Sequence, residues 1–221
     1  MIPRYTSALL ISDLHLTPSM PLTAQRFFDF CEKDTSQVEA VFILGDLFEY
    51  WVGDDAASHS PFQHEVKQAL ANLSNKVKTY YLHGNRDFLL GSAFLKKTGM
   101  TLLPDPSVVE IAGNAYLLAH GDALCTADIG YQVFRAWVRK PWLQKVFLSL
   151  PISWRRAIAN QLRMNSHANY VRGAQSSYQQ NQIKTDVTKE ACAAILREYS
   201  GDKLIHGHTH RPVSYTHLTL P

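Results

Sequence analysis

The run Val41-Phe42-Ile43-Leu44-Gly45-Asp46 joins four apolar residues to a glycine and a carboxylate. A short apolar run bounded by a turn signal is typical of a buried strand. The glycine allows the backbone to turn sharply directly after that strand. The carboxylate of Asp46 is therefore expected just beyond the carboxyl end of the strand, where open α/β sheets bind their ligands.

Four further apolar runs end in the same way. The residues that follow them include aspartate, histidine and asparagine, which are side chains that bind divalent metal ions. They are Asp13-Leu14-His15 after Ile11, His83-Gly84-Asn85-Arg86-Asp87 after Leu82, His120-Gly121-Asp122 after Ala119, and His206-Gly207-His208 after Ile205. A single Gly-Asp or Asp-x-His pair is usually a turn or a cap. Five such clusters, each at the end of a strand, predict one convergent site.

The alternation of strand-like and helix-like segments predicts a layered α/β fold. The clearest helix start is Ser60 as N-cap, with Pro61 at the first helical position and Gln63 completing a capping box. The buried face of that helix is predicted to consist of Phe62, Val66, Ala69, Leu70 and Leu73. Other helices are expected at 22–33, in a segment that stops at Gly99, and at 187–199. Strands are expected at 8–11, 41–44, 77–82 and 203–205, with a hairpin of 108–111 and 115–119 around Gly113-Asn114.

Composition and length fit one globular domain. The chain has 221 residues, of which 46% are hydrophobic and 19% charged, and its net charge of +3 does not by itself indicate a partner. Three cysteines without Cys-x-x-Cys spacing argue against a disulfide framework or a structural zinc site and fit a reducing cytosol. The apolar run 8–11 is too short for a signal peptide, and no run approaches the ~20 apolar residues that span a bilayer. We therefore expect a cytoplasmic protein with at most peripheral membrane contact.

One segment differs in charge from the rest. Between Asp128 and Asp186 there is no acidic residue, but there are nine basic ones: Arg135, Arg139, Lys140, Lys145, Arg155, Arg156, Arg163, Arg172 and Lys184. Aromatic and leucine residues are interleaved with them. This pattern predicts a helical basic-aromatic cap at 129–182, inserted between the two parts of a single core domain, 1–128 and 183–213.

The residue types of the five clusters indicate a pair of metal ions. Two carboxylates, four histidines and an asparagine suit Mn²⁺, Fe²⁺ or Zn²⁺ better than the all-oxygen surroundings of Mg²⁺. Two such ions about 3.5–4 Å apart generate hydroxide at neutral pH and bind both oxygens of an in-line displacement. The predicted ligands of a metal-dependent phosphoesterase are Asp13, His15, Asp46, Asn85, His120, His206 and His208.

The same ordered set of motifs resembles the calcineurin-like metallophosphoesterase superfamily across the whole chain. That resemblance implies a sandwich of two sheets flanked by helices, with a helical cap insertion. Within the superfamily, longer strings over residues 8–213 are similar to the family of pyrophosphohydrolases that cleave UDP-2,3-diacylglucosamine in lipid A biosynthesis. These strings are 45–49 (GDLFE), 83–91 (HGNRDFLLG), 140–144 (KPWLQ) and 204–212 (LIHGHTHRP).

The resemblance implies a reaction and a cofactor. Metal-activated water is expected to attack the α-phosphorus of UDP-2,3-diacylglucosamine, which gives UMP and 2,3-diacylglucosamine 1-phosphate. Two Mn²⁺ are expected per chain, and Asp46 is expected to bridge them. One ion is assigned to Asp13, His15, Asp46 and His208, and the other to Asp46, Asn85, His120 and His206.

Further roles follow from the same resemblance. It makes Asp46, Asn85, Arg86 and His120 the catalytic set. It implies peripheral contact with the inner membrane and no nucleic-acid partner. Substrate contacts are expected from Asn85, Arg86, Asp128, Arg163, Ser166, Asn169, Arg172 and His206. His210 is expected to orient a neighbouring ligand. Residues 214–221 do not resemble the family and are expected to be a non-native or truncated tail.

The arginine at position 86 helps to distinguish two possible activities of this fold, a pyrophosphatase and a nuclease. Many relatives have histidine at this position, where it protonates an alkoxide leaving group. Cleavage of a pyrophosphate expels a phosphate monoester whose second pKa is about 6, so the leaving group needs no proton at neutral pH. A guanidinium that binds phosphate oxygens is then more useful than an acid. The sequence thus favours a pyrophosphatase over a nuclease, and the complete ligand set disfavours a non-catalytic scaffold.

Overall fold

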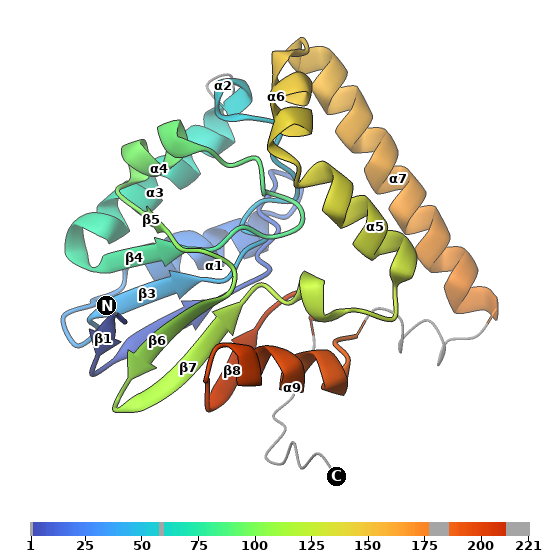
Figure 1. The fold of residues 1–221 in the computed structure, drawn as a ribbon. Helices are drawn as coiled ribbons and strands as arrows, with labels where there is room; N and C mark the ends of the chain where they lie inside the picture. The colour runs from blue at the N-terminus through green and yellow to red at the C-terminus, as the bar shows by residue number, and fades with distance from the viewer. Residues whose placement is uncertain (1, 58–59, 177–185, 211–221) are drawn as a thin grey trace.

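The computed structural model describes residues 2–57, 60–176 and 186–210, with side chains for all of these but 166–176. Two four-stranded sheets face each other, and helices cover their outer sides (Figure 1). The predicted fold class, an α/β sandwich of two sheets flanked by helices, is confirmed.

The first sheet is entirely parallel. It contains β2 (Ala8–Ile11), β3 (Ala40–Ile43), β4 (Lys78–Tyr81) and β5 (Thr101–Leu102) in that order. Ile11, Ile43 and Tyr81 are paired across β2, β3 and β4, so these strands end at one level. Strand β3 lies at the centre and all four of its residues are buried, as expected for a parallel strand that is covered on both faces.

The second sheet holds the first and the last strands of the chain. Its order is β1 (Arg4–Tyr5), β6 (Ser107–Ile111), β7 (Asn114–Ala119) and β8 (Lys203–His206). The predicted hairpin of β6 and β7 is confirmed. Its turn is formed by Ala112 and Gly113, which both have positive φ, and Asn114 already belongs to the strand. Strands β1 and β5 have two residues each, too few for a periodic pattern to reveal them.

Helices α1 (Pro21–Glu32), α3 (Pro61–Lys76) and α4 (Ser92–Thr98) cover the outer face of the first sheet (Figure 1). The side chain of Ser60 accepts a hydrogen bond from the backbone nitrogen of Gln63, as the N-cap prediction requires. The predicted face of α3 is confirmed, since Val66, Leu70 and Leu73 are buried and Phe62 packs against them in part. Helix α4 ends before Gly99, which adopts the left-handed conformation.

A second apolar cluster fills the space between the two sheets. Tyr5, Phe42, Leu44, Leu82 and Leu118 are its main members. Helix α9 (Lys189–Glu198) lies on the outer side of the second sheet and completes the layers (Figure 1). This packing fixes both sheets relative to each other, and therefore fixes the loops at their ends.

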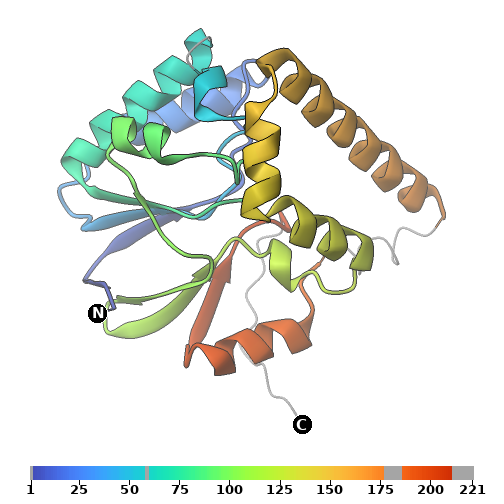
Figure 2. The ribbon, with the colours of Figure 1, turned by 45° about the horizontal axis from the view of Figure 1, so that its top comes forward.

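Three consecutive helices form the segment predicted to be a cap. They are α5 (Ile129–Val138), α6 (Pro141–Ser149) and α7 (Ile152–Ser176), and they lie together at one end of the sandwich (Figure 2). The predicted end of the cap at residue 182 and the predicted tail at 214–221 lie outside the described residues. In the part of the chain that the structure describes, no helix has the length and apolar character to cross a membrane.

Candidate metal centre

The polar clusters that follow the strands come together at the end of the sandwich where the cap lies. Backbone hydrogen bonds join neighbouring loops: Asp13 N donates to Gly45 O at 3.2 Å, and His15 N donates to Asp46 O at 3.0 Å. On the second sheet, Gly207 N donates to His120 O at 2.9 Å. The loops after β2 and β3, and those after β7 and β8, are therefore fixed in pairs.

The backbone at this site is strained. Asp13, His15, Asp46, His208 and His210 all have φ between 46° and 71°. Among the described residues other than glycine, only Ala112 and Ser200 share this conformation. A left-handed backbone costs a residue with a Cβ about 1–3 kcal/mol and tends to be retained where function requires it. The strained residues include four of the seven predicted ligands, Asp13, His15, Asp46 and His208, together with His210.

Two glycines allow the loops to approach closely. A Cβ atom at Gly84 would collide with the backbone and carboxylate of Asp46. A Cβ atom at Gly207 would collide with the side chains of Ser12 and Asp13. Any larger residue at either position would therefore displace a predicted metal ligand.

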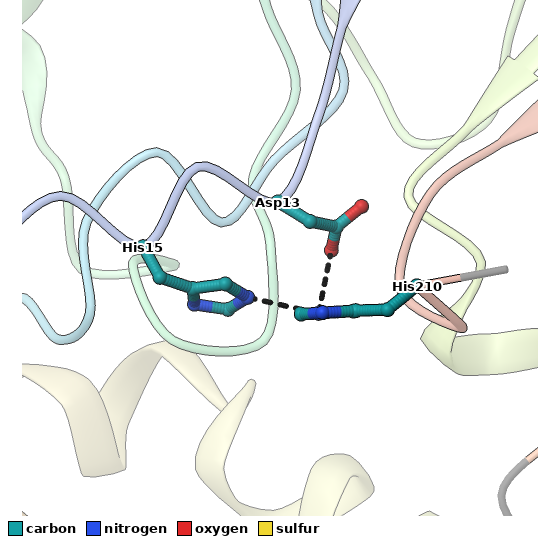
Figure 3. A group of neighbouring side chains, drawn as sticks. All are labelled: Asp13, His15 and His210. Carbon is teal, nitrogen blue, oxygen red and sulfur yellow. Dashed lines mark hydrogen bonds and ion pairs between the residues drawn. The ribbon is translucent and has the colours of Figure 1, made fainter. Parts of the chain in front are cut away.

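The first group of possible ligand atoms belongs to Asp13, His15 and His210 (Figure 3). Nε2 of His15 lies 3.0 Å from Nε2 of His210, and the two rings are stacked with centroids 4.9 Å apart. Nε2 of His210 also lies 3.7 Å from Oδ1 of Asp13. Three ligand atoms from two distant parts of the chain are thus close enough to bind one ion.

The second group is formed by Asp46, His120 and His208. Nε2 of His120 lies 3.7 Å from Oδ1 of Asp46. The side-chain oxygen of Asn85 lies 2.9 Å from both His120 Nε2 and His208 Nδ1. Asn85 therefore lies within reach of this group as a fourth donor, whereas the resemblance implies that it shares an ion with Asp46, His120 and His206; its role as a ligand stays a prediction.

Asp46 lies between the two groups. Its Oδ2 is 3.8 Å from His15 Nε2, and its Oδ1 faces His120. This position suits a carboxylate shared by two ions. His208 groups with Asp46 and His120 through its ring, while its backbone nitrogen donates to both carboxylate oxygens of Asp13, at 2.9 and 2.8 Å. The division of ligands between two ions differs in this respect from the one that the resemblance implies, and it stays a prediction.

Two histidines are placed differently from the division of ligands that the resemblance implies, and their roles toward the ions stay predictions. His206 is the last residue of β8, and its Nδ1 lies 2.8 Å from the carbonyl oxygen of Gly207. It belongs to neither group of ligand atoms in the described part of the chain. His210, which the sequence suggests only as an orienting residue, contacts His15 directly. The sequence signal for His210 was its place in the string His206-Gly207-His208-Thr209-His210.

Burial sets the protonation of the site. It lowers the pKa of His15 to about 4, with a further contribution from Arg86, and it lowers the pKa of His208 to about 4. Both imidazoles are therefore neutral at pH 7, the form that binds metal ions. Burial raises the pKa of Asp46 to about 7. Burial by itself would lower the pKa of His120, but the carboxylates of Asp46 and Asp122 and the hydrogen bond to the carbonyl oxygen of Leu44 together outweigh burial and raise that pKa.

Asp87 holds two ligand loops together, a role that sequence reasoning missed. It is fully buried, and its Oδ2 accepts hydrogen bonds from the backbone nitrogens of Leu47 and Phe48 at 2.7 and 3.2 Å. Its Oδ1 accepts from Gly84 N at 3.0 Å. The loop that carries Asn85 is thereby fastened to the loop that follows Asp46.

Asp122 fastens the cap to the core, also unforeseen from the sequence. Its buried Oδ2 accepts hydrogen bonds from Tyr131 Oη at 2.7 Å and Arg135 Nε at 2.8 Å, both on α5. Arg139, farther along the chain, donates to the carbonyl oxygen of Gly84 at 2.9 Å. The ring of Tyr131 stacks on that of His208. Helix α5 and Arg139, the residue that follows it, therefore contact three of the loops that carry predicted ligands.

Apart from Asn85 and His206, which are described above, the predicted substrate residues fall into three sets. Arg86 and Arg163 both contact the carboxylate of Glu49, at 3.0 and 3.2 Å. The side chain of Asp128 accepts a hydrogen bond from Tyr131 N and so caps helix α5. The side chains of three others lie outside those that the structure describes: Ser166, Asn169 and Arg172.

Comparison with known proteins places this geometry in a family. The model of the calcineurin-like phosphoesterase family matches residues 6–212. A protein of Aeromonas salmonicida named UDP-2,3-diacylglucosamine hydrolase is 45% identical over 207 residues, which is 93% of this chain and 78% of that protein. Proteins with the same name from Ralstonia nicotianae and Escherichia coli are 46% and 44% identical, over 91% and 93% of this chain and 76% and 82% of their own lengths.

Among solved structures, a protein of unknown function from Aquifex aeolicus covers 92% of this chain and 79% of its own, with 16% identity and a TM-score of 0.43.

Proposed function

The chain belongs to the calcineurin-like phosphoesterase family, and we propose that it hydrolyses the pyrophosphate bond of UDP-2,3-diacylglucosamine in lipid A biosynthesis. The products are UMP and 2,3-diacylglucosamine 1-phosphate. The observation that carries this proposal is the pair of ligand groups around Asp46 in a chain that is 44–46% identical to three proteins named for that hydrolysis.

The donor set suits a pair of Mn²⁺ ions. Each group combines a carboxylate with two imidazoles, and both groups are at least partly buried except for His210. Mixed nitrogen and oxygen donors suit borderline divalent ions. When bound, such ions supply a deprotonated water at neutral pH and offset the charge of phosphate oxygens. We assign the ions to Asp13, His15, Asp46, Asn85, His120, His206 and His208.

Arg86 is the residue that would hold the phosphate oxygens of the substrate while water attacks the α-phosphorus. Arg86 is placed to bind phosphate oxygens, because its backbone nitrogen is anchored to Asp46 Oδ1 at 2.9 Å and its side chain is about one-third exposed. The leaving group is a phosphate monoester, which leaves without taking up a proton at neutral pH. No acid is required opposite the nucleophile, so a fixed positive charge serves this reaction.

The acyl chains require an apolar surface, and the cap provides one. Its helices expose large apolar side chains that would ordinarily be buried: Ile129, Val133, Phe134, Trp137, Trp142, Val146, Leu148, Trp154, Ile158, Leu162 and Met164. Exposed apolar surfaces of this kind mark sites of ligand or membrane contact. We propose that the cap binds the acyl chains and that the protein works in the cytoplasm, in peripheral contact with the inner membrane. Basic residues of the cap would attract anionic lipid headgroups.

The test is hydrolysis of purified UDP-2,3-diacylglucosamine by the protein in the presence of Mn²⁺. We expect stoichiometric UMP and 2,3-diacylglucosamine 1-phosphate, and no product from Asp46→Asn. A nuclease or a general nucleotide pyrophosphatase would instead hydrolyse oligonucleotides or UDP-glucose at a comparable rate. A protein that binds Mn²⁺ but hydrolyses none of these substrates would be a binding module, and the proposal would fail.

A further inference from the structure

Glu49 lies where three functional side chains meet. Its backbone nitrogen donates to Leu16 O at 3.4 Å, and the preceding residue, Phe48, pairs with Leu16 in a short parallel bridge. The side chain of Glu49 is 19% exposed and points to the predicted metal ligands rather than to solvent. The loop that carries His15 thus holds Glu49 in place.

One oxygen of Glu49 gathers two arginines from different parts of the fold. Oε1 accepts a hydrogen bond from Arg86 Nη1 at 3.0 Å and lies 3.2 Å from Arg163 Nε. Arg86 follows β4 in the core, whereas Arg163 belongs to α7 of the cap. Two guanidinium groups that contact the same carboxylate oxygen repel each other, and the negative charge of that carboxylate offsets the repulsion. Glu49 therefore allows both positive charges to face one anionic ligand.

The other oxygen of Glu49 faces a predicted metal ligand. Oε2 lies 3.4 Å from His15 Nδ1, a buried nitrogen that has no hydrogen-bond partner among the described residues. The opposite nitrogen of the same ring, Nε2, faces Asp46 and His210. A metal-binding histidine ordinarily donates its second N–H to a carboxylate, which fixes the tautomer and the direction of the ring. Glu49 is the carboxylate placed to accept from His15.

We propose that Glu49 is a positioning residue that holds Arg86 and Arg163 for the phosphate-bearing substrate and orients His15 for the metal ion. Its effect on the arginines rests on the function proposed above. Its effect on His15 requires only that the site binds a divalent ion. The two halves can therefore be tested separately.

A simpler role for Glu49 would be to join the cap to the core. Asp55 of helix α2 (Asp54–Ala57) provides the matched control, because it too joins core to cap, through a two-pronged ion pair with Arg155 of α7. Asp55 belongs to neither group of ligand atoms. A general loosening of the cap should appear in Asp55→Asn as well as in Glu49→Gln.

The first measurement is Mn²⁺ affinity, by titration calorimetry on metal-stripped protein. Loss of a carboxylate behind a ligating histidine weakens metal affinity by about 10- to 100-fold, and we expect this for Glu49→Gln and Glu49→Ala. Asp55→Asn should retain the affinity of the wild type. Equal affinity in wild type and Glu49→Gln, or an equal loss in Asp55→Asn, would overturn the metal half of the proposal. Glu49→Gln has nearly the shape of the native side chain, so it decides the matter if Glu49→Ala does not fold.

The second measurement is steady-state kinetics at saturating Mn²⁺. We expect Glu49→Gln to raise KM for UDP-2,3-diacylglucosamine more than it lowers kcat, because the arginines bind ground state and transition state alike. Glu49→Gln and Arg163→Gln should be non-additive, since the two residues are in contact. If the effects of Glu49→Gln and Arg163→Gln are strictly additive and Glu49→Gln leaves KM unchanged, the proposed role of Glu49 toward the arginines is refuted. If the wild type does not hydrolyse this substrate, the proposed function fails, and the arginine half with it, while the Mn²⁺ titration still decides the role toward His15.

Discussion

Oδ1 of Asn85 lies 2.9 Å from Nδ1 of His208, although the two residues are 123 positions apart in the chain. Asn85 follows a strand of the first sheet and His208 follows a strand of the second. This contact connects the two sheets at the candidate metal centre. The site therefore forms only when both sheets have packed. Each variant of a site residue should accordingly be tested for stability as well as for metal binding and activity.

Replacement of Asp46 should remove both metal ions. Its two oxygens face His15 and His120, which belong to different ligand groups. We expect about two Mn²⁺ per chain in the wild type and none in Asp46→Ala, because a shared carboxylate is lost from both ions. Elemental analysis of the purified proteins measures this. Full occupancy in the folded variant would show that Asp46 is not a bridge, and one remaining ion would assign it to a single site.

Water should attack the phosphorus next to uridine. Arg86 stands where an acid would be needed for a poorer leaving group, and a sugar phosphate leaves without protonation. Attack at either phosphorus would expel a phosphate monoester, so the direction of attack rests on the resemblance to pyrophosphohydrolases of this substrate, and hydrolysis in ¹⁸O-labelled water should label UMP and leave 2,3-diacylglucosamine 1-phosphate unlabelled. Mass spectrometry of both products distinguishes the two directions of attack. Label in the sugar phosphate would reverse the proposed orientation of the substrate.

Exposed tryptophans of the cap should contact the acyl chains of the substrate. Trp142 and Trp154 are 56% and 62% exposed, so their replacement should leave the fold intact. We expect Trp142→Ser/Trp154→Ser to retain hydrolysis of a small phosphodiester and to lose most activity on the diacylated substrate, because apolar burial contributes roughly 25 cal/mol per Å².

Leu22→Ser provides the control for that experiment, since Leu22 is 78% exposed but lies on α1, outside the cap. Its activity on both substrates should match the wild type. Sedimentation with anionic vesicles should weaken in the tryptophan variant alone. Equal preference for the acylated substrate in that variant would exclude these side chains from the lipid site.

The ion pair of Asp55 and Arg155 should make the attachment of the cap dependent on pH. Hydrogen bonding to Arg155 lowers the pKa of Asp55. A carboxyl with a lowered folded-state pKa stabilises the fold above its unfolded pKa of about 3.9, and this stability is lost as the pH falls through the lower, folded value. The difference in Tm between wild type and Asp55→Asn should be greatest at neutral pH and should vanish in acid. A difference that does not change with pH would mean that the pair contributes through shape and not through charge.

Local patterns were enough to predict most elements of the fold. The helix after Ser60 was predictable because an N-cap, a proline and a periodic apolar face all act within a few residues of one another. Strand β1 was not predictable, since its two residues are ordered by pairing with β6, more than one hundred positions later. Pairing over such a separation leaves no signal in the local sequence.

The sequence by itself determined the kinds of ligand and the strand ends that carry them, because residue type and the position after an apolar run are local properties. Only the tertiary structure decided which of these side chains lie close together: it brought His210 onto His15 and placed Glu49 between Arg86 and Arg163. The physical reason is that these distances depend on how two sheets and a cap pack together. They also depend on left-handed turns at residues such as Asp13 and Asp46, which packing stabilises against the local preference of the chain.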